Sequence, residues 1–365
     1  MNRMGILIFV LLCGFGNMLA QNRITHNNKE IFLSGMNLAW IDFSKDLTRL
    51  DKSEFTRALD EISAEGGNCV RWWLHLNGRY SPLFADGKVS GLGKSEIKNL
   101  KLALDLAQER NISLILCLWS FDMLQPNALA RNHERNIQLL ENRENVKAYI
   151  DNALIPMVES LKGHPAILCW EIFNEAEGMA SDIEWGGWTP AKTTFEPYIQ
   201  RFINMTAGAI HRADSNALVS NGCWSFKVLT DIKTSRDNKN LYRDDRLIEA
   251  GNDSLGTLDF YMVHYYEWAG TEYSPFHHPA SYWQLDKPIV AAEFPAKGPC
   301  EGMDLKAAYD SLYRNGYAGA IAWSWQGHDG LGSLTDAGPA LRFIRNNYPE
   351  DISVNYTEGV SGSKP

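Results

Sequence analysis

Continuous apolar segments alternate with helical patterns along almost the whole chain. The segments lack a polar residue at every second position, which is typical of parallel strands that are covered on both faces. Each gap between them is long enough for one helix and a loop. The eight segments are residues 32–38, 69–74, 113–119, 167–173, 218–222, 258–264, 288–293 and 319–325.

The gaps carry readable helix signals. Asp51 and Glu54 resemble a capping box, so we expect a helix that begins there and ends at Gly66. Two apolar stripes with helical spacing follow, and Pro156 is expected to kink the second. The stripes are Ile97, Leu100, Leu104 and Ala107, and Val146, Ile150, Leu154, Met157 and Leu161.

Repeated alternation of strand and helix predicts parallel strands with right-handed crossovers. Eight such units close into a single α/β domain, a (β/α)8 TIM barrel. An open doubly wound sheet is the competing architecture, but its glycine-rich phosphate turn after the first strand is missing. We expect the barrel to occupy residues 21–350 and residues 351–365 to form a flexible C-terminal tail.

The N-terminus has the composition of a secretory signal peptide. Arg3 precedes an apolar run over residues 5–15, and the small residue Ala20 precedes the polar Gln21. The run is too short to span a bilayer. We therefore expect residues 1–20 to be removed after Ala20 and the protein to be secreted, extracellular or periplasmic, with no membrane attachment afterwards.

Charge and aromatic content narrow the class of partner. Thirty-five Lys and Arg against 44 Asp and Glu give a net charge of −9, which argues against nucleic acid or an anionic membrane. Twelve tryptophans suit a groove that stacks against flat ligands, although burial in a large core is the simpler explanation of most of them. We expect a monomer.

The cysteines indicate neither disulfides nor a metal site. Five remain after the signal peptide, an odd number; three of them lie inside the apolar segments and Cys223 directly follows one. No CxxC and no paired histidine spacing occurs, so we expect buried free thiols and neither a structural zinc nor any other metal or cofactor.

Acidic residues follow two of the predicted strands. In a barrel of this kind the chemistry lies at the C-terminal ends of the strands. Glu175 follows the fourth segment and Glu293 ends the seventh, so the fold should bring them together. Two facing carboxyl groups can cleave a glycosidic bond, one as proton donor and one as nucleophile, because their closeness separates their pKa values. Glu171 and Glu177 are nearby rivals.

The other polar residues at strand ends fit the same chemistry. Arg71 can stabilise a charged Glu293 or simply neutralise a buried Glu171. Asn174 can donate to a sugar 2-hydroxyl. Tryptophans near strand ends, Trp119 among them, can stack on sugar rings.

This combination resembles glycoside hydrolase family 5, a family of retaining (β/α)8 barrels. The residues that carry the resemblance are Arg71, Asn174, Glu175, His264, Tyr266, Glu293 and Trp323, in strand order. The resemblance implies that Glu175 is the acid/base and Glu293 the nucleophile.

It also implies the roles of the remaining residues. Arg71 and Tyr266 would hold the nucleophile, His264 would line the cleavage subsite, and Trp323 would form its floor. The chain departs from the family at two positions. A histidine usually ends the third strand of the family, whereas Ser120 follows Trp119 here, and the proline that often follows the acid is missing.

Two stretches are more similar to the β-mannanases of this clan than to its cellulases. They are residues 35–40, which end at Trp40, and residues 71–75. The resemblance therefore implies a secreted endo-β-1,4-mannanase without a cofactor, whose partner is polysaccharide, with Trp40 and Trp119 among the substrate-binding residues. A β-1,4-glucanase, an exo-acting β-glycosidase and an inactive glycan-binding barrel remain open as alternatives.

Overall fold

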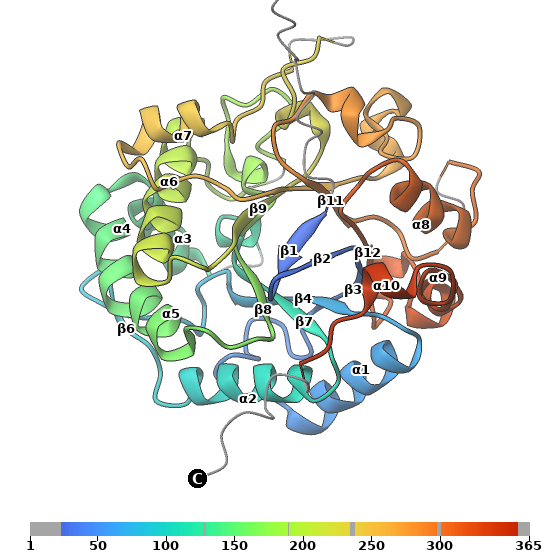
Figure 1. The fold of residues 1–365 in the computed structure, drawn as a ribbon. Coiled ribbons are helices and arrows are strands. Elements are labelled where there is room, and N and C mark those ends of the chain that lie inside the picture. Colours follow the sequence, from blue (N-terminus) through green and yellow to red (C-terminus); the bar gives the residue numbers. More distant parts are fainter. Residues whose placement is uncertain (1–22, 127–128, 189, 234–237, 298–300, 357–365) are drawn as a thin grey trace, which may run out of the picture.

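The computed structural model describes residues 23–126, 129–188, 190–233, 238–297 and 301–356. Eight parallel strands close into a barrel, with helices around it (Figure 1). Each of the eight predicted segments contains or overlaps one strand, so the predicted fold is confirmed. In their order around the barrel the strands are β3 (Leu33–Ala39), β4 (Cys69–Leu76), β7 (Ser113–Ser120), β8 (Ile167–Asn174), β9 (Val219–Cys223), β10 (Tyr261–His264), β11 (Ile289–Glu293) and β12 (Gly319–Trp323).

The helices form the outer layer in Figure 1. The first begins where the sequence predicts, because the Asp51 carboxylate accepts the backbone N–H of Glu54 and caps it. The helices are α1 (Lys52–Ala64), α2 (Glu96–Gln108), α3 (Ala130–Glu141), α4 (Arg143–Tyr149), α5 (Ile155–Leu161), α6 (Glu196–Ala213), α7 (Asp244–Gly251), α8 (Leu305–Arg314), α9 (Leu334–Asn347) and α10 (Pro349–Ile352).

The second predicted apolar stripe differs from expectation in detail. A π-helical segment, η2 (Ile150–Leu154), joins α4 to α5 where a simple kink was predicted. Pro156 has no N–H to donate, and the wider turn just before it accommodates the proline while the apolar face stays buried.

A short hairpin, absent from the sequence-based prediction, closes the N-terminal end of the barrel. Strands β1 (Ile24–His26) and β2 (Lys29–Ile31) are joined by Asn27 and Asn28, both with positive φ, as two-residue hairpin turns require. Ile24 and Ile31 are buried in the cluster that fills the barrel interior. Figure 1 shows the hairpin across the barrel opening. A second hairpin, β5 (Leu83–Ala85) with β6 (Lys88–Gly91), follows β4.

The C-terminal boundary requires a correction. A flexible tail was predicted from residue 351, but Ile352 and Tyr356 are buried, and the Tyr356 hydroxyl lies 2.6 Å from Ser113 Oγ. Two apolar side chains in a polar stretch were too weak a signal to extend the domain. Residues 357–365 and the predicted signal peptide lie outside the described residues.

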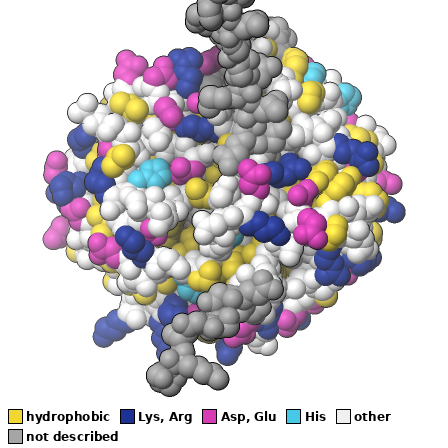
Figure 2. Space-filling model, in the orientation of Figure 1, with side chains coloured by type: hydrophobic (Ala, Val, Ile, Leu, Met, Phe, Trp, Pro, Cys, Tyr) yellow, Lys and Arg dark blue, Asp and Glu magenta, His cyan; other side chains and the backbone are white. Residues whose placement is uncertain are grey.

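Two further expectations can be compared with the structure. Cys69, Cys117, Cys169 and Cys223 are buried free thiols, as predicted, while Cys300 lies outside the described ranges. Within those ranges no helix combines the length and the apolar character needed to cross a bilayer. On the face drawn in Figure 2, basic and acidic side chains are interspersed wherever the surface is not grey, so the acidic excess is not gathered in one patch there.

Candidate active site

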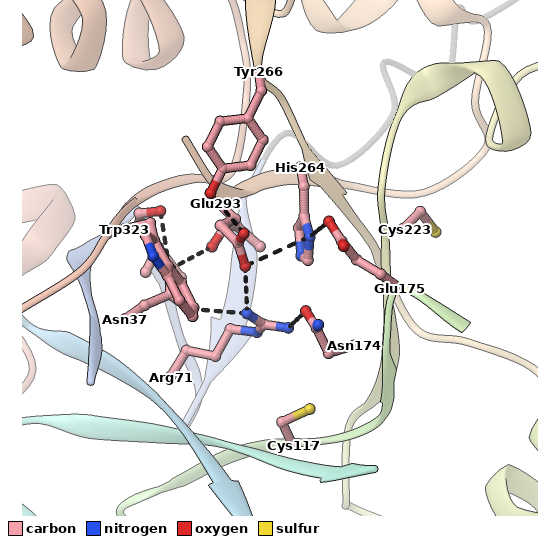
Figure 3. A network of polar contacts seen from close by, with 12 residues as sticks. Asn37, Arg71, Cys117, Asn174, Glu175, Cys223, His264, Tyr266, Glu293 and Trp323 are labelled. Carbon is pink, nitrogen blue, oxygen red and sulfur yellow. Dashed lines mark hydrogen bonds and ion pairs between the residues drawn. The ribbon is translucent and has the colours of Figure 1, made fainter. Parts of the chain in front are cut away.

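Two glutamates stand at the C-terminal ends of strands β8 and β11 and point toward each other (Figure 3). Glu175 follows β8 with φ and ψ both 50°, a left-handed conformation that is unfavourable for a residue with a Cβ by about 1–2 kcal/mol. Its N–H donates to the Gly222 carbonyl at 2.8 Å, which holds the chain in this turn. Glu293 is the last residue of β11 and is buried.

His264, at the end of β10, lies between the two carboxyl groups. Its Nδ1 is 2.7 Å from Glu175 Oε1 and 3.6 Å from Glu293 Oε2. Possible metal-ligand atoms of the three residues all lie within 4.8 Å of one another, a grouping of His, Cys, Asp and Glu that is unique among the described residues. The two carboxyl groups are also near the spacing of about 5–5.5 Å used by retaining glycosidases.

Arg71 is the centre of the hydrogen-bond network beneath the glutamates. Its side chain is fully buried, and each of its five N–H groups has an acceptor. Nε and Nη2 donate to the two oxygens of Glu171, both at 2.6 Å. Nη1 donates to Asn37 Oδ1 at 2.9 Å and to Glu293 Oε2 at 3.1 Å, and Nη2 also donates to Asn174 Oδ1 at 2.7 Å.

These contacts answer both questions that the sequence left open for Arg71. It neutralises the buried Glu171 in a bidentate pair, and through Nη1 it also contacts Glu293. Glu171 is therefore a support of Arg71. The other rival, Glu177, is fully buried and accepts the hydroxyl of Tyr242.

The surroundings of the two glutamates differ in charge. Glu293 accepts from Arg71 and from the Tyr266 hydroxyl at 2.7 Å. Burial raises the pKa of Glu293, while Arg71 and Tyr266 oppose that rise. Burial also raises the pKa of Glu175, to about 7, against the opposing charge of Arg71. Burial lowers the pKa of His264 to about 4, so that the ring is neutral near pH 7.

This difference in surroundings suits the two carboxyl groups to different chemical tasks. A carboxyl group with a pKa near 7 can still carry a proton at neutral pH and deliver it, which is the task of a general acid. A carboxylate with an arginine and a tyrosine as donors is stabilised in its charged form, which a nucleophile requires. The site can therefore combine proton donation and nucleophilic attack on opposite sides of one bond.

Three supporting residues were not assigned to the site from sequence. Besides Glu171, Asn37 joins Arg71 to the backbone of β11, because its Nδ2 donates to the Ala292 carbonyl at 2.9 Å. Gly222 leaves room for the network, since a Cβ there would lie 2.4 Å from Glu171 Oε1. Polar residues inside otherwise apolar strands are the signal that could have identified Asn37 and Glu171.

Trp323 and Trp40 lie together at the mouth of the barrel. Trp323 ends β12, and its Nε1 donates to Asp329 Oδ2 at 3.1 Å. Its ring lies 5.9 Å from that of Trp40 and 5.7 Å from that of Trp73. Trp40 is partly buried and stacks on His328. The substrate contacts expected of both residues stay predictions.

Trp119 does not reach the site. It was predicted to bind substrate, but its side chain has no exposed surface and packs against His75 and Tyr149 in the core. Its position near the end of β7 was readable from sequence, whereas the side of the strand on which its ring lies was not. In the loops after β8 and β10, Trp185 and Trp268 are exposed, by 39% and 65%.

Comparison with known proteins gives one consistent result. The family model Cellulase (glycosyl hydrolase family 5) matches residues 24–329. The mannan endo-1,4-beta-mannosidase of Mytilus edulis is 35% identical over 324 residues, 82% of this chain and 85% of that protein. The protein of the same name from Cryptopygus antarcticus is 34% identical over 326 residues, 82% of each chain. The X-ray structure of the beta-mannanase from Mytilus edulis covers 91% of this chain and 96% of its own, with a TM-score of 0.81 and 32% identity.

Proposed function

The chain belongs to glycosyl hydrolase family 5, and on that premise we propose that it is a secreted endo-β-1,4-mannanase that works by double displacement. The observation that carries the mechanism is the pair of carboxyl groups on β8 and β11, which lie on either side of His264 with oxygens within 4.8 Å. The mannan backbone is supported by two relatives named mannan endo-1,4-beta-mannosidase that each align with 82% of the chain.

In the first step Glu293 attacks the anomeric carbon while Glu175 gives its proton to the glycosidic oxygen. The bond from the anomeric carbon to that oxygen breaks, the shortened chain leaves as an alcohol, and the sugar remains as an ester on Glu293. Arg71 and Tyr266 hold Glu293 in its charged form before the attack.

In the second step the now ionised Glu175 takes a proton from water, and the resulting hydroxide attacks the anomeric carbon. The ester to Glu293 breaks, and both carboxyl groups return to their starting states. Two inversions at one carbon give net retention of configuration. A neutral His264 between the groups suits both steps, because it leaves the charge of the pair unchanged.

The test is a product analysis on galactomannan, glucomannan and cellulose, with mass and anomeric configuration of the products. We expect mixed oligosaccharides of retained β-configuration from the two mannans and far slower release from cellulose. Release of single sugars from one end, or inverted products, would contradict the endo-acting double displacement.

Two variants test the roles of the glutamates. Glu175→Gln and Glu293→Gln should each remove nearly all turnover, whereas mannan binding should be retained and neither variant should unfold at a lower temperature than the wild type. A substrate with a good leaving group distinguishes them. With an aryl mannoside, Glu175→Gln should accumulate the glycosyl ester, because departure of the aryl alcohol needs little proton donation. Glu293→Gln should form no ester. Near wild-type turnover of mannan by either variant would show that its assignment is wrong.

Export is a separate part of the proposal. The basic start, the apolar run over residues 5–15 and the Ala20–Gln21 junction support cleavage there. N-terminal sequencing of protein recovered from the culture medium or periplasm should begin at Gln21, and retention of the protein in the cytoplasm would contradict it.

A further inference from the structure

The end of β7 carries a polar chain that the mechanism above does not use. Ser120 is the last residue of β7, and Asp122 follows in the turn η1 (Phe121–Met123). Ser120 Oγ donates to Asp122 Oδ2 at 2.7 Å. Asn174 Nδ2 donates to Ser120 Oγ at 3.4 Å. All three side chains are more than nine-tenths buried, so the chain connects η1 to the end of β8 inside the protein.

This chain fixes the orientation of the Asn174 amide. Its oxygen accepts from Arg71 Nη2, and its nitrogen donates to Ser120, so the two ends of the amide are held by opposite partners. An amide nitrogen carries two hydrogens, and the bond to Ser120 uses one. Asn174 directly precedes Glu175, so its amide is next in the chain to the residue that gives its proton to the glycosidic oxygen.

Asp122 also acts on Glu175 through its charge. The turn η1 packs against η3 (Ala176–Met179), the turn that follows Glu175. After burial and Arg71, the negative charge of Asp122 is the largest influence on the pKa of Glu175, ahead of Glu171, and it raises that pKa. The titratable and charged groups around Glu175 are Arg71, Asp122, Glu171, Glu177, Cys223, His264, Tyr266 and Glu293.

We propose that Asp122 is a positioning residue of this active site: through Ser120 it orients the Asn174 amide toward the substrate, and by its charge it helps keep Glu175 protonated. The inference rests on the proposed function for its substrate.

Two variants separate the electrostatic effect from the hydrogen-bond chain. Asp122→Asn removes the charge but keeps an oxygen that can accept from Ser120. We expect the alkaline limb of kcat/KM on mannohexaose to move to lower pH by roughly 0.5–1 unit, the effect of removing one nearby carboxylate. Ser120→Ala breaks the chain without a change in charge. We expect kcat to fall about five- to tenfold with KM and the pH limb unchanged, because the Asn174 contact strengthens in the transition state.

A matched control and a rescue complete the design. Asp86→Asn removes the same charge from an exposed turn with φ of 50°, which asparagine tolerates, and should leave the pH profile and kcat unaltered. Ser120→Thr retains the hydroxyl and should restore most of kcat.

The pKa of Glu175 can also be followed without substrate, by carbon NMR of glutamate-labelled protein, with Glu175→Gln for assignment. A lower pKa in Asp122→Asn than in the wild type and in Asp86→Asn supports the proposal, whatever the substrate proves to be. An unchanged pKa in Asp122→Asn, or a Ser120→Ala variant with wild-type kcat, would overturn it. Lack of activity of the wild type on every mannan would instead refute the proposed function and leave the NMR result as the measure of this inference.

Discussion

Arg71 should be the residue whose loss destabilises this protein most among those at the active site. Replacement by methionine keeps the length of the side chain but removes five hydrogen bonds and the positive charge beneath the glutamates. Glu171 would remain fully buried without its bidentate partner, and Glu293 would lose one of its two donors.

The size of the effect follows from that arrangement. Removal of one partner of a buried ion pair destabilises a protein by about 3–5 kcal/mol, because the remaining charge is left without a partner. For a barrel of about 330 residues the entropy of unfolding is near 0.7 kcal/mol/K, so the unfolding temperature should fall by about 4–7 °C. Turnover should be lost as well, since the pKa of Glu293 rises further when the positive charge is removed.

A double-mutant cycle with Glu171→Gln gives the decisive measurement. Calorimetry or chemical unfolding of Arg71→Met, Glu171→Gln and the double variant yields the coupling between the two sites. The double variant should recover at least half of the stability that Arg71→Met loses, because no buried charge is then left unpaired. Its turnover should stay low, since Glu293 still lacks its arginine.

Two outcomes would refute this reasoning. If Arg71→Met unfolded at the wild-type temperature, the Arg71–Glu171 pair would contribute nothing to stability. If the destabilisations of the two single variants simply added in the double variant, the pair would not be coupled and the burial of Glu171 would need another explanation.

Three further predictions concern titration and binding. The alkaline limb of kcat/KM should lie near pH 7, where Glu175 loses its proton, and a limb above pH 9 would contradict this assignment. Because burial raises the pKa of Glu175 from its ordinary value of 4.5 to about 7, the wild type loses stability as the pH rises through this range. Glu175→Gln should therefore be more stable than the wild type by about 3 kcal/mol at pH 8 and equally stable at pH 4. Chemical unfolding of both proteins at the two pH values measures this difference. Trp268→Ala should raise KM for long mannan about three- to tenfold with kcat unchanged. Leu255→Ala removes another exposed apolar side chain, which precedes β10 and lies away from the strand ends that carry the site, and should have no effect on either constant.

The parts of the fold that could be predicted from sequence are those whose signal is local and long. Most barrel strands are continuous apolar runs, and α-helices occupy most of the gaps between them, so the alternation identifies the barrel. The strands of the β1–β2 hairpin have three residues each, too few for a pattern, and the π-helical segment before Pro156 has the same apolar spacing as an ordinary helix.

For the active site, the positions of the two glutamates could be predicted from sequence, but the contacts between its side chains could not. Glu175 and Glu293 were identifiable because each ends an apolar run and the barrel brings strand ends to one rim. The bidentate pairing of Arg71 with Glu171 depends on the register between β4, β7 and β8, which no spacing in the sequence reveals. Trp119 shows the same limit, because a ring near a strand end can lie on either side of the barrel wall.

The contact between the first hairpin and the last described residues has a practical use. His26 Nε2 lies 3.1 Å from the Tyr356 hydroxyl, at the end of the barrel opposite the glutamates. A short peptide linker could therefore join the two ends of the domain, and new termini could be opened in a surface loop such as the Asp86–Gly87 turn, giving a circular permutant. Likewise, a purification tag or a cellulose-binding module fused at either end would be attached at the end of the barrel opposite the glutamates.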